Sequence, residues 1–259
     1  ALIWLAVLPI LALIATALVP ALGVPLTWDS ASLRNFEAAW ASAAIRRAFA
    51  NSFMLAGLAA VISALIAIVL AWSAAVARER LARAVSWLAD AAFVVPGTVL
   101  ALAMILVWLR PIPGIGSIYG TAAILLVAYL GRFLPMVLRP VEAAIAATDP
   151  SLDEAARIAG ASRARRILWI GAPAMLPAAA AGAMLIFMTA VNELTLSALL
   201  WSAGNETIGV QIFSMQYEGN STGAAALSVL ALALVGVLVL LTDLSGRRLP
   251  RGTLPWRAD

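Results

Sequence analysis

The stretch EAARIAGASRARRILWIGAPAMLP, from Glu154 to Pro177, lies between long apolar segments of the chain. It concentrates arginine, glycine and proline where its neighbours carry few charges. Ser151 followed three residues later by Glu154 fits a capping box, which marks the start of a helix. Gly160 favours the left-handed conformation that ends helices, and Ser162 is suited to cap a following helix. The stretch therefore predicts two short helices joined by a bend.

The first of these helices carries a shallow apolar face. Leu152, Ala155, Ala156 and Ala159 recur at the spacing of one helical face. Small side chains allow another surface to approach the helix backbone closely, which favours a docking helix. A loop whose arginines reach lipid headgroups is equally compatible with the local sequence.

The composition places the chain among polytopic membrane proteins. It has 259 residues, of which 64% are hydrophobic and 12% are charged, with a mean hydropathy of +1.00. Cysteine, histidine and lysine are absent from the sequence. This excludes disulfides, imidazole bases, the usual zinc sites and a phosphate-binding loop of the Walker A type, which needs lysine. We expect no cofactor, and any ATP hydrolysis must take place on a partner subunit.

The apolar runs predict an all-α bundle of about six transmembrane helices in a single domain, residues 1–259. Several runs reach the roughly 20 residues that a spanning helix needs. The predicted spans are 1–20, 48–77, 86–109, 118–138, 170–200 and 224–243. An amphipathic helix is expected at 33–47, and polar loops are expected at 139–169 and 202–223. No basic region of a signal peptide precedes the first run, so we expect a mature spanning helix there and a natural chain that extends further upstream.

The arginines predict the orientation. With six spans, one side of the membrane holds thirteen arginines and the other holds four. The thirteen are Arg78, Arg80, Arg83, Arg132, Arg139, Arg157, Arg163, Arg165, Arg166, Arg247, Arg248, Arg251 and Arg257. The positive-inside rule then places both termini and the 139–169 loop in the cytoplasm of a bacterial inner membrane. No basic soluble face with interleaved aromatic residues is present, so nucleic-acid binding is not expected.

The spacing of the opening stretch resembles the EAA motif of permease subunits of bacterial ABC importers. Glu154-Ala155-Ala156 is followed after three residues by Gly160, and after nine more by Ile170, one residue, Ala172 and Pro173. The sequence departs from that motif in having Ala172 where leucine is usual. The resemblance implies that the short helix is a cytoplasmic coupling helix that docks on an ATP-hydrolysing subunit. It assigns Glu154, Ala155, Ala156 and Gly160, with Ala159 of the same face, to this interface.

Most of the chain also resembles, more diffusely, the ferric-iron permease branch of that family. The resemblance implies alternating access, with a periplasmic solute-binding protein delivering the solute. It further implies a lipid bilayer as surroundings and a second permease half or homodimer partner, the chain resembling the C-terminal half of a doubled permease. Branches for polyamine, thiamine, phosphonate and sulfate share the architecture and remain alternatives.

Two polar interruptions of the spans are candidates for the translocation path. Glu193 is an ionisable residue within a predicted span, and Asn192 lies beside it; an unpaired carboxylate at that depth is costly unless it faces a cavity or a partner. Pro96 and Gly97 break another span and free backbone groups that need polar partners. Each feature is equally open to a structural interpretation. Glu193 is then a carboxylate at the membrane interface or one paired with another helix, and the Pro96–Gly97 break is a packing kink. A channel or ion-coupled secondary transporter using Glu193, or a membrane scaffold, is the rival hypothesis.

Overall fold

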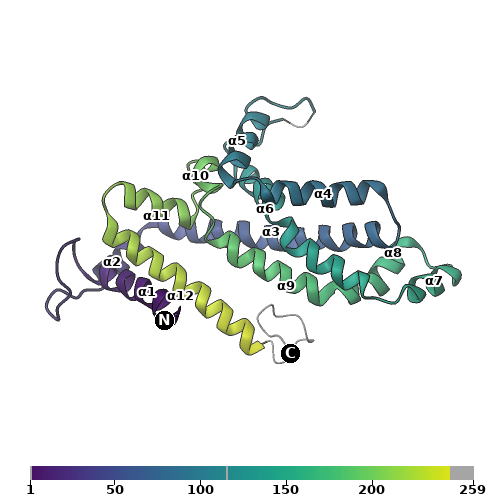
Figure 1. Ribbon diagram of the computed structural model, residues 1–259. Coiled ribbons are helices and arrows are strands. Elements are labelled where there is room, and N and C mark those ends of the chain that lie inside the picture. The colour runs from purple at the N-terminus through teal and green to yellow at the C-terminus, as the bar shows by residue number, and fades with distance from the viewer. Residues whose placement is uncertain (1, 115, 246–259) are drawn as a thin grey trace.

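The chain folds as an all-α bundle, as predicted (Figure 1). The computed structural model describes residues 2–114 and 116–245, and within them regular structure is helical apart from one isolated bridge between Ile112 and Gly116. The helices are α1 (Leu2–Leu18), α2 (Arg34–Ala41), α3 (Ala43–Ala75), α4 (Arg80–Val94), α5 (Gly97–Trp108), α6 (Ala122–Ala146), α7 (Pro150–Ile158), α8 (Arg163–Arg166), the π-helical η1 (Ile167–Gly171), α9 (Ala172–Val191), α10 (Ser197–Leu200), α11 (Ile208–Tyr217) and α12 (Ser221–Ser245).

The core is formed by α3, α6 and α9, which pack against one another in all three pairings. Trp72 of α3, Tyr129 of α6 and Met175 of α9 are among its largest fully buried side chains. Helix α4 packs on α6 and α3 along the outside of this trio. Many of the remaining buried positions are alanines, which allows the helix backbones to approach closely.

A second group of helices joins the core at one end. Helix α1 packs against α12, and α2 and α11 also lie on α12. The end of α1 is secured by Asn35 of α2, whose side-chain amide donates hydrogen bonds of 2.8 Å to the backbone oxygens of Ala17 and Val19. Ala17 lies in the last turn of α1 and Val19 just after it, where carbonyls lack partners within the helix, so Asn35 acts as a cap supplied from outside.

The number of spans differs from the six that were predicted. Among the described residues, four helices are long and apolar enough to cross a membrane: α3, α6, α12 and the continuous helix of residues 163–191. The pair α4 and α5 counts as a fifth at most, because the two are bent by 116° at their junction. The apolar part of α1, Val7–Leu18, is shorter. The predicted span 86–109 is thus a broken helix, since Val95 before Pro96 is extended and ends α4.

Several boundaries also differ. The predicted amphipathic helix at 33–47 divides at Ser42, whose hydroxyl accepts a hydrogen bond from the backbone N–H of Ile45 and begins α3. Helix α6 continues to Ala146 rather than ending at 138, with Pro135 and Pro140 inside it. The predicted polar loop at 202–223 contains α11, a helix that was missed because polar and apolar residues alternate irregularly there.

Helices α6 and α9 cross closely at Gly182. A Cβ atom added at Gly182 would lie 2.6 Å from Cα of Val137 and 2.8 Å from its Cβ. Since the nearest obstacle is the backbone of Val137, α9 cannot accept a side chain at Gly182 unless one of the helices moves. Gly57 of α3, by contrast, has nothing within 4 Å of the corresponding position.

We expect Gly182→Ala to destabilise the detergent-solubilised protein by about 1–3 kcal/mol, because it forces the helices apart. Gly57→Ala is the matched control and should stabilise by up to about 1 kcal/mol, because alanine has the higher helix propensity. Thermal unfolding followed by circular dichroism measures both. Equal shifts in Tm for the two variants would contradict the proposed close crossing.

Candidate functional site

Helix α7 begins with an aspartate cap. The side chain of Asp149 accepts a 2.9 Å hydrogen bond from the backbone N–H of Ser151, and Pro150 occupies the first helical turn. This bond lowers the pKa of Asp149 below its ordinary value of 3.8, because it favours the charged carboxylate. The predicted capping box of Ser151 and Glu154 is therefore wrong: the cap lies two residues earlier, since Pro150 is preorganised for the first turn.

The end of α7 follows the prediction. Gly160 has a φ of +77°, in the left-handed region. Its N–H donates to the carbonyl of Arg157, and the N–H of Ala161 donates to that of Ala156, both at 3.0 Å. This is the Schellman arrangement, which satisfies the last carbonyls of a helix. Ser162 then caps α8 by accepting from the N–H of Arg165, as expected.

The surface of α7 is open. No residue of α7 is buried, and Glu154, Ala155, Ala159 and Gly160 are all exposed. Ala156 is half-buried, on the side that faces α8. The helix also exposes Ile158, with 86% of its surface accessible, an apolar residue that the sequence analysis did not single out. Leu152 is more than half exposed.

A cleft of about 670 Å³ separates α7 from the ends of α3 and α6. Trp72 and Val76 line it from α3 and its end, Ile145 lines it from α6, and Asp153 and Glu154 line it from α7. Helix α7 therefore stands away from the bundle and does not pack into it (Figure 1).

The segment after α7 runs without a break into α9. Residues 163–191 form one helix in which residues 167–171 are π-helical, and the N–H of Ala172 bonds to the carbonyl of Ile167, five residues earlier. Pro173 lacks an N–H and cannot complete the normal ladder, which accounts for the wider turn at this point. The fifth span thus begins in the region predicted as loop.

The close approach of this helix to α3 requires Gly171. A Cβ atom there would lie 2.7 Å from Cδ1 of Trp72. Two arginines then cover Trp72: the guanidinium carbons of Arg163 and Arg166 each lie 5.3 Å from its ring centroid. Sequence reasoning treated these arginines as markers of the cytoplasmic side, because no local signal connects residue 72 with residues 163–166.

The break between α4 and α5 is stabilised by Arg132. Its guanidinium donates hydrogen bonds to the backbone oxygens of Phe93, at 2.8 Å, and Val95, and it lies over the Phe93 ring. The carbonyls freed by the proline break thus find the polar partner that they need. Arg132 and Arg139 both lie inside α6, which continues beyond them to Ala146.

Glu193 caps α10 after the end of α9. One carboxylate oxygen accepts a 2.8 Å hydrogen bond from the N–H of Leu196, and the other accepts from the N–H and hydroxyl of Ser197, both at 3.1 Å. Because Ser197 donates its proton to the carboxylate, the buried Tyr129 hydroxyl donates in turn to Ser197, at 2.7 Å. Glu193 is half-buried and is hydrogen-bonded through both oxygens.

The two interruptions that were singled out as path candidates lie side by side. A Cβ atom at Gly97, the first residue of α5, would lie 2.9 Å from Cγ2 of Thr195. The Pro96–Gly97 break and the segment that follows α9 are therefore packed together. Asn192, at the end of α9, is exposed.

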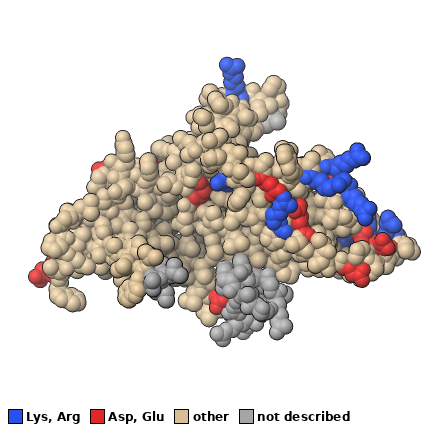
Figure 2. Space-filling view, in the orientation of Figure 1, with Lys and Arg blue, Asp and Glu red and all other residues tan. Residues whose placement is uncertain are grey.

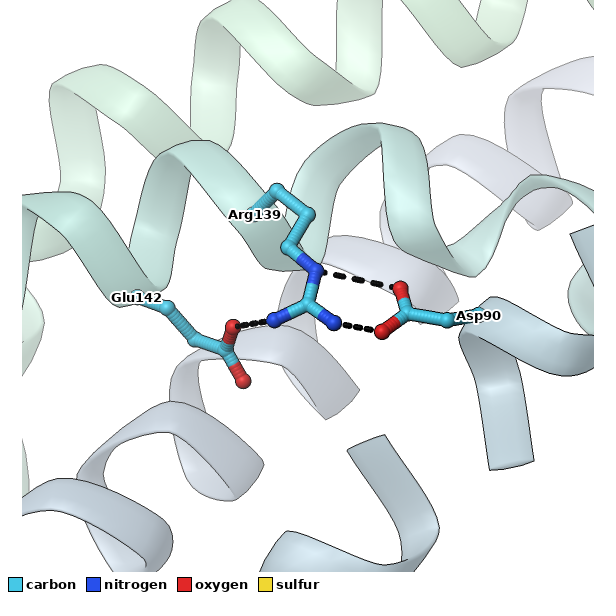
Figure 3. A network of polar contacts seen from close by, with 3 residues as sticks. All are labelled: Asp90, Arg139 and Glu142. Atoms are coloured by element: carbon cyan, nitrogen blue, oxygen red, sulfur yellow. Dashed lines mark hydrogen bonds and ion pairs between the residues drawn. The ribbon is translucent and has the colours of Figure 1, made fainter. Parts of the chain in front are cut away.

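A further ion network ties α4 to α6. In Figure 3, Arg139 of α6 lies between two carboxylates. Its Nε donates to Asp90 of α4 at 3.0 Å, a second nitrogen pairs with the other oxygen of Asp90, and a third lies 2.6 Å from Glu142. All three side chains are partly exposed.

Basic side chains gather at the end of the molecule that holds α7, α8 and the start of α4, while the opposite, left-hand part of the visible face shows few charges (Figure 2). The last four arginines of the predicted cytoplasmic set, at positions 247, 248, 251 and 257, lie outside the described residues.

A family model described as the binding-protein-dependent transport system inner membrane component matches residues 64–254, which is most of the sequence. The chain belongs to this family. The matched range includes α7 and the whole of the predicted EAA motif. The family is one of transport components and not of catalytic enzymes.

Two curated relatives are transport permease proteins as well. The Fe(3+)-transport system permease protein FbpB 2 of Haemophilus influenzae is 26% identical over 194 residues, covering 75% of this chain and 38% of that protein. The probable ABC transporter permease protein y4fN of Sinorhizobium fredii is 27% identical over 259 residues, covering 96% of this chain and 44% of that protein. The chain therefore spans about two fifths of the length of these relatives.

A solved structure shows the same fold. It is a bacterial alginate ABC transporter in complex with its alginate pentasaccharide-bound periplasmic protein. One of its chains superposes with a TM-score of 0.77 at 18% identity, over 96% of this chain and 92% of that chain. The predicted permease-like helical fold is thereby confirmed.

The environment of Glu193 gives a prediction. We expect Glu193→Ala to destabilise the protein by about 1–2 kcal/mol, because three donors lose a charged acceptor at the start of α10. Asn192→Ala, at the exposed neighbour, should change stability by less than about 0.5 kcal/mol. Thermal unfolding in detergent compares the two. A neutral Glu193→Ala variant would show that the carboxylate is not a structural cap.

Proposed function

We propose that the chain is the membrane-spanning permease portion of a binding-protein-dependent ABC importer, and that α7 is the helix through which a cytoplasmic ATP-binding subunit acts on it. Family membership supports the transport role. The observation that carries the second part is the isolation of α7: it is capped at both ends, buries no residue of its own and projects beyond the bundle.

The exposed side of α7 suits a docking surface. The exposed Ala155 and Ala159 leave its backbone accessible, Glu154 adds a charge, and Ile158 and Leu152 add apolar area that the bundle does not cover. Exposed apolar residues on a rigid, capped helix are typical of a helix that enters a groove on a partner. The proposed interface therefore comprises Glu154, Ala155, Ala159 and Gly160, with Ala156 supporting it from behind.

The distribution of arginines supports the orientation. The α7 end carries most of the arginines of the described residues, which favours its placement on the cytoplasmic side. A periplasmic solute-binding protein would then meet the opposite end, where α11 and the loop before α2 lie. Both termini are proposed to be cytoplasmic.

The second half of the transporter is proposed to come from elsewhere. The chain spans only about two fifths of its curated relatives, which favours one half of a doubled permease or one copy of a homodimer. The translocation path would run between the halves. The adjoining segments at Pro96–Gly97 and Asn192–Glu193 are candidates for its lining, with Asn192 the more accessible side chain and Glu193 holding the segment in shape.

Transport is proposed to follow alternating access. Closure of the ATP-binding subunits would displace α7, and the helices joined to it would reopen the path on the other side. The rival hypothesis of an ion-coupled carrier or channel has less support, because both oxygens of Glu193 already accept hydrogen bonds.

The coupling assignment predicts that Glu154→Arg and Gly160→Pro weaken association with the cognate ATP-binding subunit at least about tenfold, which corresponds to about 1.4 kcal/mol. The first places a charge of opposite sign on the exposed face; the second removes the left-handed end of α7. Co-purification from membranes measures the effect. Glu218→Arg at the end of α11, far from α7 in the sequence, is the control. Undiminished co-purification of both test variants would refute the assignment.

The substrate is proposed to be ferric iron, on the strength of the Fe(3+)-transport relative. Polyamine, thiamine, phosphonate and sulfate are the alternatives. We expect the cognate periplasmic protein to bind Fe³⁺, as measured by tryptophan fluorescence or calorimetry. Binding of one of the alternatives without Fe³⁺ would overturn the iron assignment and leave the importer assignment intact.

A further inference from the structure

The contact of α7 with the rest of the protein is unusually narrow. Its half-buried residues are Asp153 and Ala156, and both face α8 and η1. Asp153 also lines the cleft of about 670 Å³ that separates α7 from the ends of α3 and α6. Apolar packing therefore cannot hold α7 at a fixed angle to the bundle, and its angle depends on the turns at its two ends and on Asp153.

Asp153 forms an ion pair with Arg166. One carboxylate oxygen lies 2.5 Å from a guanidinium nitrogen, and the side chains are 16% and 15% exposed. The ion pairs of Arg139 with Asp90 and Glu142, and of Arg163 with Glu79, are more open to solvent at both partners. An ion pair shielded in this way is screened less by salt and holds its geometry more firmly.

Arg166 connects this pair to α3. Its guanidinium carbon lies 5.3 Å from the centroid of the Trp72 ring, and Trp72 is 1% exposed, so its position is fixed by the core. Arg163 lies on the same ring, pairs with Glu79 at 2.5 Å and donates to the Ser73 hydroxyl at 2.9 Å. The helix that begins at Arg163 is thereby attached to the end of α3 and to the residue before α4.

We propose that Arg166 is a positioning residue that transmits the displacement of α7 to the bundle, by linking Asp153 of α7 to Trp72 of α3. This inference rests on the proposed role of α7 as the coupling helix. It assigns Arg166 no contact with the ATP-binding subunit. The residue instead makes α7, α9 and α3 move as one unit.

The chemistry of the three groups suits this role. The planar guanidinium can pair with a carboxylate along one edge while its face rests on an aromatic ring, which lysine cannot do as well. The pair also lacks a substitute: among the described residues, Oδ1 of Asp153 and Nε of Arg166, which lie outside the ion-pair contact, are buried and have no hydrogen-bond partner. Loss of either side chain therefore leaves a shielded charge unpaired and frees α7.

The test uses the full chain, reconstituted in proteoliposomes with its cognate ATP-binding subunit and binding protein. Asp153→Asn and Arg166→Gln are compared with Arg165→Gln, an exposed arginine one position away. Three quantities are measured: co-purification of the ATP-binding subunit, ATP hydrolysis, and solute transported per ATP hydrolysed. We expect both variants to retain co-purification and hydrolysis while transport per ATP falls about tenfold or more, a size typical of coupling between sites. Arg165→Gln should behave as wild type.

A double-mutant cycle sharpens the result. Because each single change already breaks the same pair, Asp153→Asn combined with Arg166→Gln should reduce transport per ATP little further than either alone. Arg166→Lys, which keeps the charge and loses the flat face, should give an intermediate ratio.

Three outcomes would overturn the inference: unchanged transport per ATP in both single variants, additive losses in the double variant, or loss of co-purification in step with loss of transport. If the other variants prove unstable in thermal unfolding, Arg166→Lys is the deciding variant. A wild-type value of transport per ATP for Arg166→Lys would show that stacking on Trp72 has no role. Failure of the wild-type protein to bind the ATP-binding subunit would instead refute the proposed function itself.

Discussion

The approach of α6 and α9 at Val137 and Gly182 sets the geometry on which the rest of the bundle depends. In an apolar environment, leucine gains little by leaving lipid for a neighbouring helix, so helices associate through close van der Waals fit and polar contacts. Buried alanines of α3 and α9 extend this fit. Trp72 and Tyr129 are among the largest buried side chains, and each is matched by a specific partner group.

Polar side chains are placed where the backbone needs them. Arg132 binds the carbonyls released at the break between α4 and α5, Glu193 binds the first N–H groups of α10, and Asn35 binds the last carbonyls of α1. Each of these groups comes from outside the helix end that it satisfies. A chain with so few charges thus uses several of them to support irregular backbone, which an apolar environment would otherwise penalise.

The sequence predicted the helical class, the EAA segment and the glycine that ends α7, because these depend on composition and on local spacing. It failed where the deciding partner is distant. The cap of α10 by Glu193 becomes clear only with the fold. The contact of Arg166 with Trp72 could not be predicted either, because the two residues are ninety-four positions apart in the chain. The sequence predicted the break at Pro96. The 116° bend, however, depends on Arg132, which binds the carbonyls freed there, and on Thr195, which packs against Gly97.

The π-helical turn at residues 167–171 has a consequence for how this segment can change in length. Successive residues of an α-helix are rotated by about 100°, and a π turn accommodates one additional residue without adding a turn. A regular helix with one residue fewer would therefore keep Arg163 and Arg166 on nearly the same face. The same number of residues wound as a regular α-helix would instead swing the two arginines by about 100° around the axis, away from the Trp72 ring on which they lie. The wide turn thus sets the register in which the arginines meet the ring, and straightening it without a deletion would act like the loss of both arginines at once.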